Sequence, residues 1–327
     1  MIRMLYLSAD GKLLADLNLI DLEISLHDPK GVIWVDFEGA PNAEAEPILR
    51  DKFHFHPLAI DDALQENHSP KLDDWGSYLY IVMHTILFDP AEGEVKTQEL
   101  DFFVGSNYLV THHDAPIEAV DQIWKTCQRD ERIMKGGPDH LLYRILDEIA
   151  SRYMPVVEKL DLAIDELEDD IFIGKNTATL EKLFTLKRAV LYLQRILARQ
   201  REVLNQLARD PYDQIDAKDR VYFRDVYDHL VRLYDIIESV RDLISGTMDT
   251  YLSVINNRMN EIMKTLTVIT TLFMPLSFVT GFFGMNFLQP SAPLNIWTGL
   301  PAFLVTLAII LFTPLVMFGW MRHRKWM

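Results

Sequence analysis

Two long apolar runs near the end of the chain dominate its hydrophobic pattern. Residues 265–321 are 57 consecutive positions without Asp, Glu, Lys, Arg or His in a chain of 327 residues. The apolar runs cover residues 265–283 and 296–321, and a turn at residues 284–295 separates them. About 20 apolar helical residues are needed to cross the hydrocarbon core of a bilayer. The pattern therefore predicts two transmembrane helices joined by an outer loop, with the lipid bilayer as a partner.

Residues 1–135 show a different pattern, in which β-rich runs alternate with helical ones. The β-rich runs cover residues 2–7, 32–37, 78–88, 100–104 and 108–112, and the helical runs cover residues 43–52, 58–66 and 117–129. The β pattern ends at the break Lys135-Gly136-Gly137-Pro138. We therefore expect an α/β N-terminal domain.

Residues 136–216 carry helical periodicity alone and predict a long antiparallel helical hairpin. Its first helix begins at Asp139, which we expect to be the N-cap, and continues to about Phe172. Its second helix covers residues 177–208 and ends before Pro211, since proline cannot continue a helix.

Residues 217–264 predict a stalk helix that continues into the first transmembrane helix. One face carries apolar residues in alternating steps of three and four, the heptad spacing of a helix packed in a coiled coil. These residues are Val226, Leu230, Leu233, Ile237, Val240, Ile244, Thr247, Tyr251 and Val254. Gly246 and Pro275 are the weak points of such a helix.

A stripe of small and polar residues follows the opposite face of this helix into the membrane segment. Its members there are Asn260, Met263, Thr267, Thr270, Met274, Ser277 and Gly281. Such a stripe either mediates close helix packing in lipid or lines an aqueous path, and the spacing leaves both interpretations open. A path requires a ring of subunits, because one hairpin cannot enclose it. Neutral oxygens suit a hydrated cation such as Mg²⁺, and Met263, Leu266 and Met274 would be apolar constrictions.

The charge of the chain is unevenly distributed. The net charge is −16, yet residues 258–327 carry five basic residues and one acidic residue. Residues 1–257 therefore carry 27 basic and 47 acidic residues. This balance opposes nucleic-acid binding and attracts cations, although an acidic surface also serves solubility. The lone cysteine, Cys127, fits a reducing compartment.

Basic residues flank the outer ends of the predicted membrane hairpin. Lys264 precedes the first helix, and Arg322, Arg324 and Lys325 lie in the tail at residues 322–327. Positive charge marks the cytoplasmic side of membrane proteins. We therefore expect a multi-pass protein of the cytoplasmic membrane with both termini in the cytoplasm and the turn outside.

The sequence shows no arrangement of residues typical of an enzyme. Gly136-Gly137 lacks the Lys and Ser or Thr of a phosphate-binding loop. No nucleophile with a neighbouring base is evident either. We expect neither catalysis nor nucleotide binding.

The sequence resembles the CorA-type magnesium/cobalt transporter family, whose members have two transmembrane helices and a Gly-Met-Asn motif. The resemblance rests on Phe283-Gly284-Met285-Asn286-Phe287 and on two preceding segments, Asn260-Glu261-Ile262-Met263-Lys264 and Phe273-Met274-Pro275-Leu276-Ser277-Phe278. Two further segments, Tyr222-Phe223-Arg224-Asp225-Val226-Tyr227-Asp228-His229 and His56-Pro57-Leu58, also look like family sequence.

The resemblance implies a homopentameric funnel whose pore is lined by the first transmembrane helix of each subunit. Gly284, Met285 and Asn286 would then form the selectivity filter, with five Asn286 carboxamides facing a hydrated cation. Asn260 would form an inner polar ring, and Leu266 and Met274 the hydrophobic gate.

The family also places regulatory cation sites between subunits. The matching positions are Asp62 and Asp225, with Asp61 and Asp147 nearby. Bound Mg²⁺ would bridge carboxylates that otherwise repel, holding the subunits closed when cytoplasmic Mg²⁺ is high. The acidic end of the first hairpin helix would approach the basic ring of Arg322, Arg324 and Lys325.

Two departures from the family pattern are present. The outer loop at residues 284–295 lacks the acidic residue that members often carry, and Ser277 replaces a threonine. The first departure weakens electrostatic concentration of cations at the loop, and the second preserves a hydroxyl.

The expected function is that of a Mg²⁺ channel gated by cytoplasmic Mg²⁺, with Co²⁺ or Ni²⁺ as further transported ions. Two alternatives stay open. One is a Zn²⁺ transporter of the same superfamily, with or without proton coupling, and the other is a non-conducting membrane-anchored coiled-coil sensor or scaffold. A divalent ion gains about 4.6 kcal/mol in crossing a potential of about 100 mV, so uptake needs no ATP.

Overall fold

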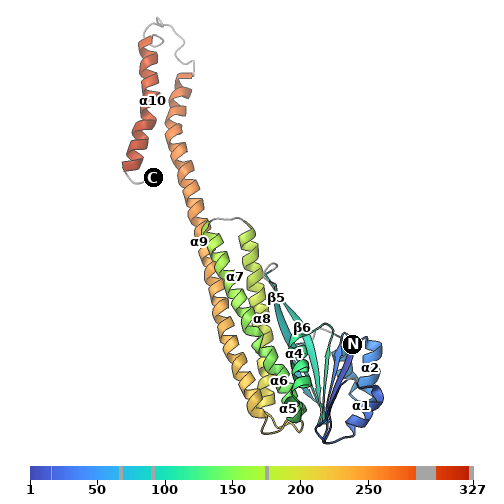
Figure 1. The fold of residues 1–327 in the computed structure, drawn as a ribbon. Helices are drawn as coiled ribbons and strands as arrows, with labels where there is room; N and C mark the ends of the chain where they lie inside the picture. The colour runs from blue at the N-terminus through green and yellow to red at the C-terminus, as the bar shows by residue number, and fades with distance from the viewer. Residues whose placement is uncertain (16, 66–68, 90–92, 174–176, 285–299, 324–327) are drawn as a thin grey trace. The chain divides into compact units, whose positions relative to one another are not determined.

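The computed structural model describes the chain except for residues 16, 66–68, 90–92, 174–176, 285–299 and 324–327 (Figure 1). The chain forms two compact units, Met1–Met248 and Asp249–Met327. Helix α9, Arg220–Gly284, contributes residues to both units.

The first unit contains a seven-stranded sheet with the strand order β2-β1-β3-β7-β6-β5-β4. The strands are β1 Ile2–Leu7, β2 Leu13–Ala15, β3 Val32–Glu38, β4 Lys71–Asp74, β5 Leu79–Asp89, β6 Glu94–Val104 and β7 Tyr108–His113. Among these described strands β3 and β7 pair in parallel, and the other neighbours pair antiparallel. The sheet is therefore mixed, and its centre is formed by strands distant in sequence.

Helices cover both faces of this sheet (Figure 1). They are α1 Leu19–Leu26, α2 Asn42–Asp51, α3 Pro57–Leu64, α4 Glu118–Arg129, α5 Arg132–Lys135, α6 Pro138–Ser151, α7 Tyr153–Ile173 and α8 Thr177–Arg209. Leu22, Leu49 and Ile60 of α1 to α3 share a buried apolar core with sheet residues such as Val35 and Phe103. Helices α6, α7 and α8 contact strands of the sheet in a second layer of packing. Burial on both faces explains the unbroken apolar runs at residues 32–35 of β3 and 79–83 of β5. The strands also bury a few polar residues, among them Asp36 of β3 and Asp101 of β6.

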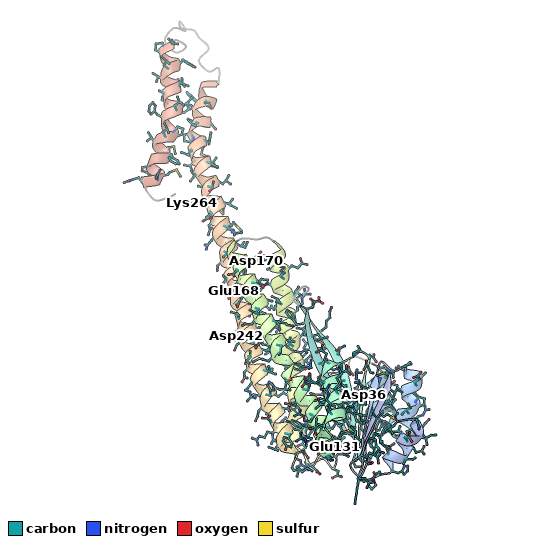
Figure 2. All side chains as sticks on the ribbon, in the orientation of Figure 1. Asp36, Glu131, Glu168, Asp170, Asp242 and Lys264 are labelled. Carbon is teal, nitrogen blue, oxygen red and sulfur yellow. The ribbon has the colours of Figure 1, made fainter. Side chains whose placement is uncertain are left out.

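Helices α7, α8 and the first part of α9 pack together beside the sheet. The predicted heptad stripe on α9 is buried from Val226 to Thr247, which confirms it as the packing face of that helix. Thr247 Oγ1 donates a hydrogen bond of 2.6 Å to Glu168 of α7, which Figure 2 labels. Gln194 of α8 likewise donates to the Tyr234 hydroxyl of α9 at 3.3 Å.

The structure corrects two expectations about the start and the continuity of the hairpin. Gly137, with a φ of 111°, is the N-cap of α6, and Pro138 occupies the first helical turn. Asp139 therefore lies inside the helix instead of capping it. The helix expected to continue to Phe172 is interrupted at Arg152, the C-cap of α6, and α7 follows as a separate helix.

The second unit consists of the end of α9 and of α10, Leu300–His323, which lie side by side in Figure 1. The described chain contains two helices long and apolar enough to span a bilayer, in Arg220–Phe282 and Phe303–His323. Pro275 lies inside α9 and the helix continues past it to Gly284. An α/β domain, a long helix and two candidate spans confirm the predicted fold class.

Candidate functional site

The polar stripe of α9 is exposed in the second unit. The exposed residues are Asn260, Met263, Leu266, Thr267, Thr270, Met274, Ser277 and Gly281. The half-buried positions of the same segment are Val268, Thr271, Leu272, Pro275, Leu276 and Val279. They recur in steps of three and four, as one face of a helix does, so a single face of α9 is covered within the unit.

A matching face of α10 is half-buried or buried. Its residues are Thr306, Ile310, Thr313, Pro314, Met317 and Met321. Among the described residues, this unit consists of the end of α9 and of α10, which Figure 1 shows side by side. We infer that these two covered faces are turned toward each other. At about 100° per residue, the polar stripe lies roughly opposite the α10-facing side of α9. Packing within the hairpin therefore does not account for the stripe.

Threonine hydroxyls of the stripe are oriented by the helix itself. Thr267 Oγ1 donates to the Met263 carbonyl at 2.7 Å, and Thr270 Oγ1 donates to the Leu266 carbonyl at 2.9 Å. A hydroxyl that donates to its own backbone keeps its lone pairs for another donor. The stripe thus presents acceptor oxygens, the partners that water around a cation requires.

Gly281 has free space around it among the described residues. A Cβ built at Gly281 would meet none of their atoms within 4 Å, so packing against them does not demand glycine there. Gly284 is the last residue of α9. Met285 and Asn286 of the predicted filter, and Arg324 and Lys325 of the predicted basic ring, lie outside the described residues. Arg322 is exposed in the last turn of α10.

Two of the predicted regulatory aspartates come close to one aromatic pair in the first unit. Tyr143 of α6 stacks on Tyr222 of α9 with ring centroids 4.9 Å apart. Burial raises the pKa of the Tyr143 phenol, and the negative charges of Asp147 and Asp225 raise it further. Both carboxylates therefore act on the same small region of the α6–α9 surface, where Arg144 lies 4.0 Å from Asp147.

The other two predicted regulatory aspartates lie on α3 and have partners within the chain. Asp62 forms an ion pair of 2.5 Å with Lys71, which also contacts Asp73 at 2.8 Å. Asp61 accepts a hydrogen bond from the Gln65 amide. Asp62 and Asp225 share no partner among these contacts. A shared site between subunits is what the family resemblance implies for them.

Sequence reasoning missed a different group of carboxylates. Asp139, Asp216 and Asp219 are possible cation ligands, and one oxygen of each lies within 4.8 Å of the other two. The acidic pair at positions 216 and 219 is a local signal, since residues three apart in a helical turn share a side. Asp139 is distant in sequence, so the group could not be recognised without the fold.

An α/β domain joined by a long helix to two candidate spans defines a class of two-span membrane proteins with a large domain outside the bilayer. The sequence model of the CorA-like Mg²⁺ transporter protein family matches residues 29–323. The chain belongs to this family.

Individual relatives agree with this assignment. The chain is 36% identical over 254 residues to the putative metal ion transporter YfjQ of Bacillus subtilis (strain 168), covering 78% of each protein. It is 29% identical over 309 residues to the cobalt/magnesium transport protein CorA of Thermotoga maritima, covering 94% of this chain and 87% of that protein.

Solved structures show the same fold over the full length. The complete structure of the CorA magnesium transporter from Methanocaldococcus jannaschii superposes with a TM-score of 0.84 at 26% identity, covering 99% of this chain and 98% of that one. The full-length CmaX protein, at 23% identity, matches with a TM-score of 0.70 over 99% of this chain and 97% of that one.

Proposed function

We propose that the chain is the subunit of a homopentameric Mg²⁺ channel of the cytoplasmic membrane, with Co²⁺ and Ni²⁺ as further transported ions. Membership of the CorA-like family supports divalent-cation transport. The relative from Thermotoga maritima carries a name that specifies cobalt and magnesium, and the solved structure from Methanocaldococcus jannaschii is that of a magnesium transporter.

The observation that carries the proposal is the exposed polar stripe on the side of α9 away from α10. Five stripes facing a common axis would enclose a path lined by neutral oxygens and by methionine side chains. Mg²⁺ gives up its water reluctantly, so it passes most readily with its hydration shell held by acceptors. The back-bonded hydroxyls of Thr267 and Thr270 are such acceptors.

Within this path the predicted roles follow the order of residues along α9. Asn260 forms the inner polar ring, Leu266 and Met274 form the gate, and Gly284-Met285-Asn286 forms the outer filter. Exposed Leu266 and Met274 side chains in five copies can exclude water from a narrow pore, which closes it to ions. Both termini face the cytoplasm, as Lys264 and Arg322 at the two ends of the hairpin favour.

Regulation by cytoplasmic Mg²⁺ rests on carboxylates from two subunits. Asp61 and Asp62 on α3 of one subunit would face Asp147 and Asp225 of the next. Mg²⁺ bound between them stabilises the closed arrangement, and its loss lets the subunits separate, because the ion binds one state better than the other. Negative membrane potential then drives uptake, by a factor of roughly 2000 for a divalent ion at about 100 mV.

Mg²⁺ flux into liposomes that contain the full-length protein tests the proposal. We expect flux in the wild type and its loss in Asn286→Ala. Thr270→Val keeps the shape of the side chain and removes its oxygen, so it should lower flux several-fold. Thr280→Val is the matched control, because Thr280 is also exposed and also bonds its own helix, at Leu276, but lies off the stripe.

The other outcomes of this assay identify the alternatives. Zn²⁺ flux that follows a proton gradient, with no Mg²⁺ flux, would assign the protein to Zn²⁺ transport. Absence of flux for every ion and gradient would leave a membrane-anchored sensor. Equal losses in Thr270→Val and Thr280→Val would contradict the role of the stripe.

A further inference from the structure

Three carboxylates meet where α6 and α9 begin in the first unit. Asp139 is the second residue of α6, and Asp216 and Asp219 lie in the segment directly before α9. One oxygen from each lies within 4.8 Å of the other two. Asp139 is 4% exposed and Asp219 is 3% exposed, whereas the Asp216 side chain is 64% exposed. Two of the three carboxylates, Asp139 and Asp219, are thus buried, and Asp216 faces solvent.

Hydrogen bonds explain the position of Asp139 but not that of Asp219. The two Asp139 oxygens accept from the backbone amides of His140 and Asp216, both at 2.9 Å. Asp219 Oδ1 lies 3.4 Å from His140 Nδ1. Asp219 Oδ2 is buried and receives no hydrogen bond from the residues that the structure describes. A buried carboxylate oxygen without a donor is costly unless a cation neutralises it.

Lys218 only partly supplies that positive charge. Its Nζ lies 2.8 Å from Asp216 but 3.7 Å from Asp219 Oδ2, beyond hydrogen-bond range. The Lys218 side chain is 68% exposed, so it can swing into solvent without disturbing the core. Three carboxylates against one lysine leave the group short of positive charge, and the His140 ring also lies beside it.

We propose that Asp139, Asp216 and Asp219 form a binding site for a hard divalent cation, Mg²⁺ or Ca²⁺, within each subunit. Carboxylate oxygens are the ligands both ions prefer. Opposite ligands lie about 4.2 Å apart around Mg²⁺ and about 4.8 Å apart around Ca²⁺. These are the largest ligand separations that each ion allows, and the three oxygens lie within 4.8 Å of one another, so the group is close to the size that one shared ion requires.

Such an ion would fasten the start of α9 to the start of α6. Asp216 and Asp219 precede Arg220, the first residue of α9, and the backbone amide of Asp216 is already held by Asp139. The ion would slow opening of this junction, which hydrogen exchange of the segment before α9 reports. The site shares no residue with the proposed pore lining or with the proposed sensor at Asp62 and Asp225, and its test counts bound ions instead of measuring transport.

Counting bound Mn²⁺ by electron paramagnetic resonance on the full-length protein in detergent tests the site. The count is read as a difference between matched proteins, because Mn²⁺ also enters other sites. Asp219→Asn and Asp216→Asn should each bind one Mn²⁺ fewer per chain than the wild type. Asp216→Asn matters most, since an exposed side chain can be changed without loss of folding. Asp213→Asn is the control, an exposed aspartate of the same segment outside the group.

Two further measurements sharpen the result. Lys218→Gln removes the competing ammonium and should raise Mn²⁺ affinity several-fold. Competition with Mg²⁺ and with Ca²⁺ then identifies the preferred ion. Wild-type Mn²⁺ counts in folded Asp216→Asn and Asp219→Asn, or the same loss in Asp213→Asn, would overturn the proposal whatever the flux assay shows.

Discussion

Asp101 of β6 is a buried acidic residue whose ionisation is shifted by its surroundings. It is 2% exposed, accepts a hydrogen bond of 2.7 Å from the Tyr80 hydroxyl, and lies 3.8 Å from His112 Nδ1. Burial raises the pKa of Asp101 to about 6. The folded protein therefore favours the neutral acid. This contribution to stability is present below the unfolded pKa of about 3.9 and is lost as pH rises through about 6.

Asp101→Asn should remove this pH dependence, because the amide stays neutral. Relative to wild type, the variant should gain about 2 kcal/mol of unfolding free energy between pH 4.5 and pH 7.5. Denaturant unfolding of the full-length protein at the two pH values measures the difference. Glu94→Gln, an exposed change on the same strand, should show no such gain. If the difference in unfolding free energy between Asp101→Asn and wild type is the same at both pH values, then Asp101 ionises in the folded protein as it does in the unfolded one.

At the residue scale, the sequence identified candidate residues from their chemical type and spacing, but it did not show which residues contact one another. The Asn260–Gly281 stripe could be read from spacing, since helical geometry fixes which residues share a face. The role of Asp139 could not, because its partner, the Asp216 amide, is distant in sequence. The burial of Asp101 could not be predicted either, because the pattern of a strand does not say which of its polar residues the helices cover.

At the element scale, periodicity located the long helices within a few residues. Helix α8, Thr177–Arg209, and α9, Arg220–Gly284, begin and end close to the predicted positions. Strands β2 and β4 were missed because one has three residues and the other reads Lys-Leu-Asp-Asp. The break at Arg152 was missed because apolar periodicity continues across it. Pro155 in the first turn of α7 is the local signal that was overlooked, since proline lacks the amide hydrogen that would continue α6.

The buried stripe of α9 makes a prediction about this element. Leu233 is 1% exposed and Leu243 is 36% exposed on the same helix. Leu233→Ala should cost about 2–5 kcal/mol of unfolding free energy, since it leaves a cavity in a packed layer. Leu243→Ala should cost much less, because solvent already reaches that side chain. Chemical unfolding of both variants measures the contrast, and equal losses would argue against α9 packing through the heptad face.

At the scale of the whole molecule, the proposed regulation would depend on contacts between two subunits. Asp62 is paired with Lys71, and Asp225 is exposed near Tyr143, on different elements of the first unit. Sequence resemblance could propose that they meet across subunits, but neither periodicity nor the fold of one chain can supply the second subunit. The proposal of a Mg²⁺ sensor therefore has to be tested on the assembled channel.

Asp225→Lys provides that test. The side chain is exposed, so the substitution should leave folding intact, and it places a fixed positive charge where the ion would bind. A bound cation is then repelled, and the lysine itself can pair with Asp62 of the neighbouring subunit. Current through the variant should therefore not respond to internal Mg²⁺, whereas wild-type current should fall as internal Mg²⁺ rises.

Asp235→Lys makes the same charge change at another exposed position of α9 and should keep the wild-type response. If both variants lose Mg²⁺ inhibition, the effect is one of total charge. If Asp225→Lys is still inhibited by internal Mg²⁺, regulation does not act through Asp225, because the variant has no carboxylate at this position to bind the ion.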